Sequence, residues 1–160
     1  MNILLSRDLD SRITFRELAA VQEWLSTTPN KAIHAMRDNP AHNIGLLGAS
    51  WGTDLTKDNG RSRWKKSWKK ILDDPDTYQS RQIHGPDQVI LNKYIWKTWG
   101  KHSSVQHDSY CCENFPGSIG FPTQRILAPN NYVASVWIEK DKMVKRCPVK
   151  CRRYADWIYC

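Results

Sequence analysis

The chain lacks any long hydrophobic run, and this absence narrows the possible functions first. No apolar stretch approaches the roughly 20 residues that a membrane-spanning helix needs. The apolar start ends after Leu5 and acidic residues follow at once, so we expect no signal peptide in this chain. The sequence therefore predicts no transmembrane segment.

Several motifs are missing as well. The cysteines do not form the Cys-x2-Cys pairs of a zinc site, and no glycine-rich phosphate loop is present. No zinc finger or RNA-recognition signature occurs, so a nucleic-acid-binding protein is the weakest alternative and we expect no nucleic-acid partner. The chain also has no Asn-x-Ser/Thr glycosylation sequon.

Acidic residues are comparatively few. The 24 Lys and Arg residues outnumber the 16 Asp and Glu residues, which gives a formal net charge of +8. Such a charge favours an anionic partner, for example nucleotide phosphates, a sulfated glycan or an anionic membrane surface. A basic surface without a partner is the alternative.

The five cysteines favour disulfides, and disulfides are typical of a secretory compartment. Their number is odd, so at least one thiol is free or pairs outside the chain. The spacing does not define the pairing. The cysteines are Cys111, Cys112, Cys147, Cys151 and Cys160.

The length of 160 residues fits one domain or part of a larger one, and the 40% hydrophobic content is enough for a packed core. Apolar periodicity and turn residues predict an α/β arrangement. The expected elements are a strand at 3–5, a helix at 15–26, a strand at 31–37, a glycine-rich apolar run at 44–52, helices at 61–72 and 86–99, a loop at 100–131 and a last strand at 132–138. Glycine in the apolar run serves either close packing or the approach of a ligand.

The expected helix at 61–72 is amphipathic. Apolar residues recur on one face, and the other face is basic. This face is either a docking surface for a polyanion, such as an acidic glycan, or an ordinary solvated surface. Its basic residues are Arg61, Arg63, Lys65, Lys66, Lys69 and Lys70.

Asp8 and Asp10 directly follow the first strand, and two carboxylates at alternate positions there can reach one hard cation. Asp87 stands at a helix start, where an acid also simply complements the helix dipole. His107 lies in the expected long loop. The alternatives are a polar strand end for the Asp pair, a helix acid for Asp87 and a surface histidine for His107. We leave His34, His42, His84 and His102 as structural residues.

These residues occur in the order found in the metal-dependent GT-A glycosyltransferase fold, which the chain resembles. Over about residues 4–136, the amino-acid sequence is similar to that of a glycosyltransferase-like family of large multidomain or secreted proteins. The blocks that carry the resemblance are Arg7-Asp8-Leu9-Asp10-Ser11-Arg12, Met36-Arg37-Asp38-Asn39-Pro40, Leu47-Gly48-Ala49-Ser50-Trp51-Gly52, Gly85-Pro86-Asp87-Gln88 with Leu91-Asn92, His107-Asp108-Ser109-Tyr110 and Phe121-Pro122-Thr123-Gln124-Arg125.

The resemblance implies a function and a set of site residues. It implies transfer of a sugar from a nucleotide-sugar donor to a glycan or protein acceptor, with Mn²⁺ or Mg²⁺ as cofactor. The implied metal ligands are Asp8, Asp10 and His107, the implied catalytic residue is Asp87, and the implied donor-binding residues are Arg7, Arg12 and Gln88. A non-enzymatic binding module for acidic glycans is the alternative.

The resemblance also implies an architecture. It predicts an incomplete GT-A-like mixed sheet flanked by helices at residues 1–138, without the N-terminal nucleotide-binding half, and a basic cysteine-bearing tail at residues 139–160. Such a piece can lack activity alone. The full-length protein is then expected in the secretory pathway, in the Golgi lumen or outside the cell.

Overall fold

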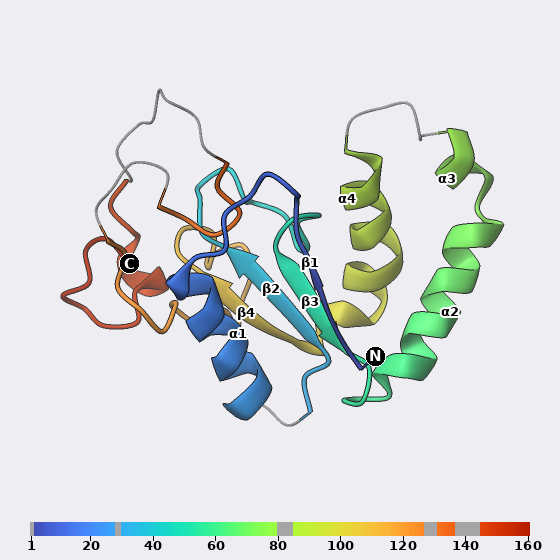
Figure 1. The fold of residues 1–160 in the computed structure, drawn as a ribbon, viewed down its shortest axis with the longest axis horizontal. Coiled ribbons are helices and arrows are strands. Elements are labelled where there is room, and N and C mark those ends of the chain that lie inside the picture. The colour runs from blue at the N-terminus through green and yellow to red at the C-terminus, as the bar shows by residue number, and fades with distance from the viewer. Residues whose placement is uncertain (1, 28–29, 80–84, 127–130, 137–144) are drawn as a thin grey trace.

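The computed structural model describes residues 2–27, 30–79, 85–126, 131–136 and 145–160 (Figure 1). It is an α/β structure with a small mixed sheet of four strands flanked by helices. The strands are β1 (Ile3–Ser6), β2 (Ile33–Arg37), β3 (Trp51–Asp54) and β4 (Ser104–Asp108). The helices are α1 (Phe15–Thr27), α2 (Gly60–Asp73), α3 (Pro75–Gln79), α4 (Pro86–Leu91), the π-helix η2 (Asn92–Gly100) and the short 3-10 helix η3 (Val149–Cys151).

The order of the strands brings two loops to one edge of the sheet. The spatial order is β1-β3-β2-β4, with β3 antiparallel to both neighbours and β2 parallel to β4. Trp51 at the start of β3 pairs with Ser6 at the end of β1 and with Ala35 near the end of β2. The chain therefore leaves β1 and β2 on the same side, and the segments after these two strands are neighbours in space.

All five residues of β2 are buried, and alternate side chains enter different layers. Ile33 and Ala35 join a core with the tryptophans of η2, while Met36 joins a core with Trp24 of α1. Figure 1 shows the same layers, with α1 on one side of the sheet and the pair formed by α2 and the α4–η2 helix on the other. The sheet thus has an apolar core on each face.

The helix ends follow from local chemistry. Thr14 caps α1, because its Oγ1 accepts a hydrogen bond from the Glu17 amide at 3.2 Å. Asp74 takes an extended conformation and ends α2, and Pro75 then opens α3. Pro86 is in the first turn of α4, after Gly85 with a φ of 87°.

The expected helices are present, but one of them and two further expectations need correction. The helix at 86–99 exists, but its second part is π-helical. The region expected as a loop at 100–131 contains β4, the parallel partner of β2. Residues 132–136 form no strand and contribute only an isolated bridge between Ser11 and Val136, while residues 137–138 lie outside the described part.

Disulfides are present, as the cysteine content predicted, and one of the two attaches the C-terminal segment to the rest of the molecule. Cys112 is bonded to Cys151, and Cys147 is bonded to Cys160. Cys111 is free and buried, and burial raises the pKa of its thiol to about 11. Within the described ranges, every helix is too short or too polar to cross a lipid bilayer.

Candidate active site

A cavity of about 320 Å³ opens at the sheet edge where β1 and β2 end. Its lining comes from four segments that lie far apart in the sequence: the loop after β1, the segment between β2 and β3, the start of α4 and the segment at 131–136. The described residues that line it are Asp8, His42, Leu47, Gly48, Ala49, Ser50, Asp87, Gln88 and Ala134.

Asp8 enters this cavity from a turn that follows β1. The amide and the hydroxyl of Ser11 both donate to the Asp8 carbonyl, at 3.2 and 2.9 Å, and fix the turn. The Asp8 side chain remains exposed. Asp10 is also exposed, but it is not among the residues that line the cavity.

Asp87 and Gln88 reach the same cavity from the first turn of α4. Gly48 makes room for the carboxylate, because a Cβ at this position would lie 2.4 Å from Asp87 Oδ2. The Gly48 carbonyl accepts a hydrogen bond from Ser6 Oγ at 2.7 Å, which ties this glycine to the end of β1. The structure therefore places Asp8 and Asp87 on the lining of one cavity, with Gly48 directly beside the Asp87 carboxylate.

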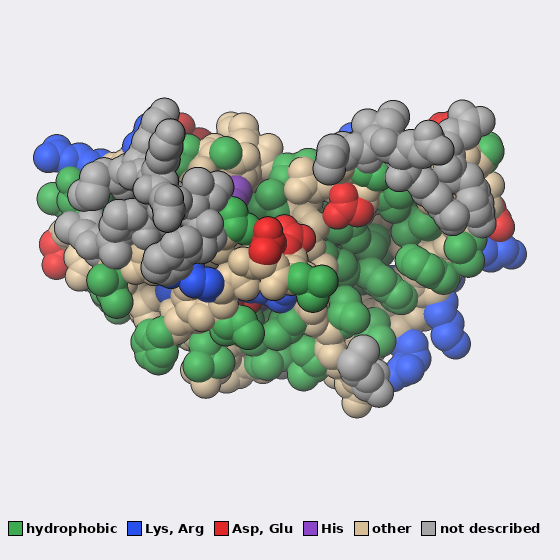
Figure 2. All heavy atoms as spheres, turned by 45° about the horizontal axis from the view of Figure 1, so that its top comes forward, with side chains coloured by type: hydrophobic (Ala, Val, Ile, Leu, Met, Phe, Trp, Pro, Cys, Tyr) green, Lys and Arg blue, Asp and Glu red, His purple; other side chains and the backbone are tan. Residues whose placement is uncertain are grey.

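No Lys or Arg is among the described residues that line the cavity, so its charge comes from the two carboxylates. Arg7 turns away from it: its guanidinium pairs with the buried Glu17 and donates to the Arg12 carbonyl at 2.8 Å. Arg12 is likewise not a lining residue. Figure 2 shows acidic side chains near the middle of this face and a row of basic ones along its right-hand margin. A bare anion would meet repulsion here, whereas a cation would be attracted.

His42 is a lining residue that the sequence reasoning left as structural. Its Nδ1 accepts a hydrogen bond from the Asp38 amide at 3.3 Å, so the proton of the neutral ring is on Nε2. Burial lowers the pKa of His42 to about 4, which keeps the ring neutral at physiological pH. His42, a lining residue, therefore carries an N–H donor on Nε2. In the sequence, the feature next to His42 is the turn formed by Asp38-Asn39-Pro40, and it does not by itself predict a fixed imidazole orientation.

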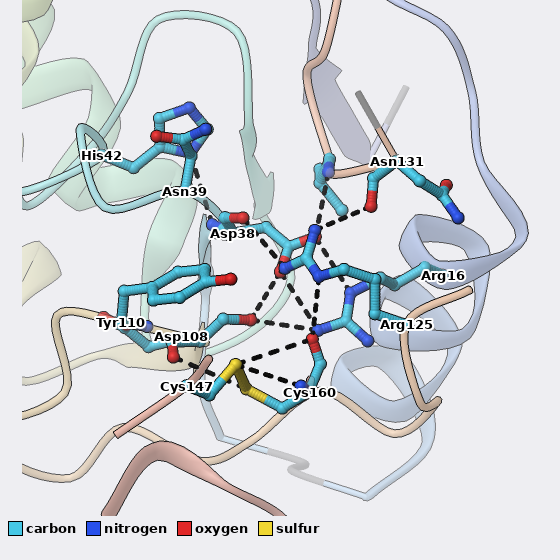
Figure 3. A network of polar contacts seen from close by, with 12 residues as sticks. Arg16, Asp38, Asn39, His42, Asp108, Tyr110, Arg125, Asn131, Cys147 and Cys160 are labelled. Atoms are coloured by element: carbon cyan, nitrogen blue, oxygen red, sulfur yellow. Dashed lines mark hydrogen bonds and ion pairs between the residues drawn. A yellow bond between two sulfur atoms is a disulfide. The ribbon is translucent and has the colours of Figure 1, made fainter. Parts of the chain in front are cut away.

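A buried network around Asp38 holds the walls of the cavity (Figure 3). Arg16 donates to the Asp38 carboxylate at 2.9 and 3.1 Å, and Arg125 forms a second ion pair with it. The Val133 amide donates to the same carboxylate at 3.0 Å and so fixes the position of Ala134, which has a φ of 65°. Two cationic side chains and one carboxylate thus join α1, the segment after β2 and the segment at 131–136.

The structure does not bring His107 to this cavity. His107 is fully buried on β4, where Nδ1 lies 2.8 Å from His34 Nε2 and Nε2 lies 3.2 Å from Glu23 Oε2. Arg153 completes the chain of contacts by donating to both Glu23 oxygens. Hydrogen bonds from His107 and Arg153 lower the pKa of Glu23 to about 2. Both ring nitrogens of His107 therefore have partners inside the protein.

The donor set of the cavity fits a hard divalent cation that is shared with a ligand. Within the described ranges, no three His, Cys, Asp or Glu side chains are grouped closely enough to hold a metal ion by themselves. Mg²⁺ is commonly bound by one or two carboxylates, with phosphate oxygens and water in the other positions. Asp8 and Asp87 would supply those two carboxylates, and Gly48 leaves space beside them.

Comparison of the chain with protein-family models, curated proteins and solved structures finds no match.

Proposed function

We propose that the chain is a glycosyltransferase-like domain of the GT-A type, in which this cavity binds the diphosphate of a nucleotide sugar together with Mn²⁺ or Mg²⁺. The observation that carries the proposal is the meeting of Asp8, Asp87 and Gln88 in one cavity. These residues belong to two of the six sequence blocks that carry the resemblance to GT-A enzymes. The mixed sheet flanked by helices is compatible with part of such a fold.

The charge of the cavity supports a cation-dependent mode of binding. A diphosphate carries negative charge and would be repelled by Asp8 and Asp87 alone. A bound divalent cation supplies the positive charge that stabilises a leaving diphosphate. In this proposal Asp8 and Asp87 hold the cation, and Arg7, Arg12, Asp10 and His107 have no direct role.

The remaining polar residues orient the donor. The amide side chain of Gln88 is half-buried and lines the cavity, so it can bind a phosphate or sugar oxygen. The Nε2–H of His42 can donate to an anionic oxygen without adding a charge that would repel the cation. These two neutral donors complement the two carboxylates.

The disulfides support the location that this function requires. Two disulfides in a small domain are typical of the oxidising secretory pathway or the extracellular space. Glycosyl transfer from nucleotide sugars to glycans or proteins takes place in that pathway. We therefore place the proposed activity in the secretory pathway, on a glycan or protein acceptor.

A thermal-shift titration tests the proposal. Mn²⁺ with UDP or GDP at about 100 times the dissociation constant stabilises a protein by ~2.7 kcal/mol, which raises the melting temperature of a domain this size by roughly 5–10 °C. We expect this rise to need both Mn²⁺ and the nucleotide. Asp8→Asn and Asp87→Asn should each abolish it.

Asp10→Asn is the matched control, because it removes the same charge from the same loop but outside the cavity. It should keep the rise in melting temperature. An equal loss in Asp10→Asn would refute the assignment of the site to the Asp8–Asp87 cavity. Absence of any Mn²⁺-dependent rise with either nucleotide would refute the proposed function.

A further inference from the structure

Helix α2 presents a second charged surface, of opposite sign to the cavity. Cations recur along its solvent side at Arg61, Lys65 and Lys69, four residues apart, so they form a row about 12 Å long. Lys66 and Lys70 form a parallel row beside it. All five side chains are exposed, and Figure 2 shows blue side chains along the right-hand margin, the side on which α2 lies in Figure 1. We call these two rows the basic face of α2.

The opposite side of α2 is anchored firmly, so the basic face is a rigid platform. Trp64 stacks on Trp51 of the sheet, with ring centroids 5.6 Å apart. Ser67 is buried, donates to the Tyr94 carbonyl at 2.8 Å and accepts from Trp99 Nε1 at 3.0 Å. Lysines on a fixed helix lose less conformational freedom on binding than lysines on a mobile loop.

The basic face is electrostatically unbalanced. Asp73, the last residue, is the one acid in α2. Lys65 with Lys69 and Lys66 with Lys70 are like-charge pairs four residues apart, and such pairs destabilise a helix by about 0.2–0.5 kcal/mol each. Among the described residues, the ion pair that involves α2 is formed by Arg63 with Asp58, away from the two rows. A bound polyanion would relieve the repulsion between the lysines.

An exposed aromatic residue adjoins the cations. Trp68 is 51% exposed and stands three residues after Lys65, so the two side chains are neighbours on the helix surface. Leu72 is 48% exposed on the same side. A flat indole beside a row of cations matches a pyranose ring that carries anionic groups. Two apolar side chains among five cations form a poor apolar face for membrane insertion.

The disulfides favour an acidic glycan over a nucleic acid as the polyanion that binds this face. They indicate an oxidising compartment, where sulfated and uronic-acid glycans are abundant and nucleic acids are not. We propose that the basic face of α2 binds a linear sulfated glycan, with Arg61, Lys65 and Lys69 along the sulfate groups and Trp68 against a sugar ring. This site is separate from the cavity and does not depend on the proposed glycosyl transfer.

Binding of a heparin-derived octasaccharide, followed by calorimetry at physiological ionic strength, tests this proposal. Each exposed charge contact contributes up to about 1 kcal/mol, so the triple variant Lys65→Gln, Lys66→Gln, Lys69→Gln should bind at least about tenfold more weakly. Trp68→Ala should weaken binding of the octasaccharide but leave binding of inorganic polyphosphate unchanged. The melting temperature of each variant should match that of the parent chain.

The matched control removes three exposed cations from the C-terminal segment, in Lys145→Gln, Arg146→Gln, Lys150→Gln. This variant has the same net charge as the α2 variant and should bind the octasaccharide like the parent chain. An equal loss in both triple variants would show that net charge alone drives binding and would overturn the proposal. Tighter binding of a single-stranded oligonucleotide or of anionic phospholipid vesicles than of the octasaccharide would also overturn it. Asp8→Asn should not affect this assay, so it can fail independently of the nucleotide assay.

Discussion

At the scale of single residues, the carboxylate of Asp38 organises the walls of the cavity. It is completely buried and receives donors from Arg16, Arg125, Ser109 and the Val133 amide. Each donor comes from a different segment of the chain, and together they satisfy a charge that would otherwise be costly to bury. The position of Ala134 and the orientation of His42 both depend on this residue.

Asp38→Asn should therefore destabilise the protein strongly. The amide would leave the buried guanidinium groups of Arg16 and Arg125 without a counter-charge, and breaking such a pair costs about 3–5 kcal/mol. Urea denaturation would measure this loss of unfolding free energy. Asp58→Asn is the control, because its pair with Arg63 is partly exposed to solvent and contributes at most about 1 kcal/mol. Similar losses in both variants would contradict the role of Asp38.

The sequence predicted some of the candidate site residues and missed others for physical reasons. Asp8 and Asp87 were predicted as candidates because a strand end and a helix start are visible in the local pattern and because both lie in blocks of the family resemblance. The position of His107 was not, because its partners His34 and Glu23 are distant in the sequence and no local spacing reveals them. His42 was missed for a different reason: its amide partner Asp38 is only four residues away, but the cavity that it lines is closed by segments distant in the sequence.

At the scale of elements, two glycines of the run at 44–52 have different surroundings. A Cβ at Gly45 would lie 2.3 Å from the buried ring of Trp96, so this glycine is needed for packing. A Cβ at Gly48 would meet only the end of the Asp87 side chain, which is exposed and able to move. One glycine thus belongs to the core and the other to the cavity.

Alanine substitutions should separate these two roles. Gly45→Ala forces Trp96 to shift and should cost about 1–3 kcal/mol in urea denaturation. Gly48→Ala should leave the stability nearly unchanged but displace Asp87, and so reduce the thermal shift with Mn²⁺ and nucleotide. A large stability loss in Gly48→Ala, or an unchanged thermal shift, would contradict this distinction.

The elements that the sequence predicted are those that carry their own apolar periodicity. Helices α1, α2 and α4 were visible from one apolar face each and from their terminal residues. Strand β4 was not, because Gln106 and Asp108 bind Arg37 on one face of the sheet while His107 binds His34 on the other. Its polar residues look like a loop until their long-range partners are known. Residues 132–135 are the opposite case, because their alternating pattern predicted a strand. Val133 is buried, but these residues form no strand.

At the scale of the whole molecule, buried neutral histidines link stability to pH. Burial is the main reason that the pKa values of His34, His107 and His42 lie below the ordinary value of 6.5. The charged and titratable groups that face them are Glu23, Arg16 and Arg153 around the first two, and Asp38, Arg37 and Arg125 around the third.

Unfolding should therefore become easier as the pH falls below about 6.5. Below this pH the histidines bind protons in the unfolded chain but stay neutral in the folded protein. The unfolding free energy therefore decreases by up to ~1.4 kcal/mol per pH unit for each histidine. For His42 this loss continues to about pH 4, the pKa in the folded protein. Urea denaturation at pH 7.5, 6.5 and 5.5 would measure it. His42→Gln should flatten the dependence and the exposed His102→Gln should not; equal stability at all three pH values would contradict the prediction.

Strand β2 has a consequence for how the sheet is assembled. Its two polar side chains, three positions apart, point to opposite faces, where His34 meets His107 and Arg37 meets Asp108. A register shift of β2 by one residue would exchange the two faces of the strand. Arg37 would then lie against Trp24 of α1, and His34 would lie among the helices on the other side of the sheet. In the misaligned sheet the Arg37 guanidinium would be buried without a counter-charge, so the Arg37–Asp108 ion pair favours the native register over its nearest alternative.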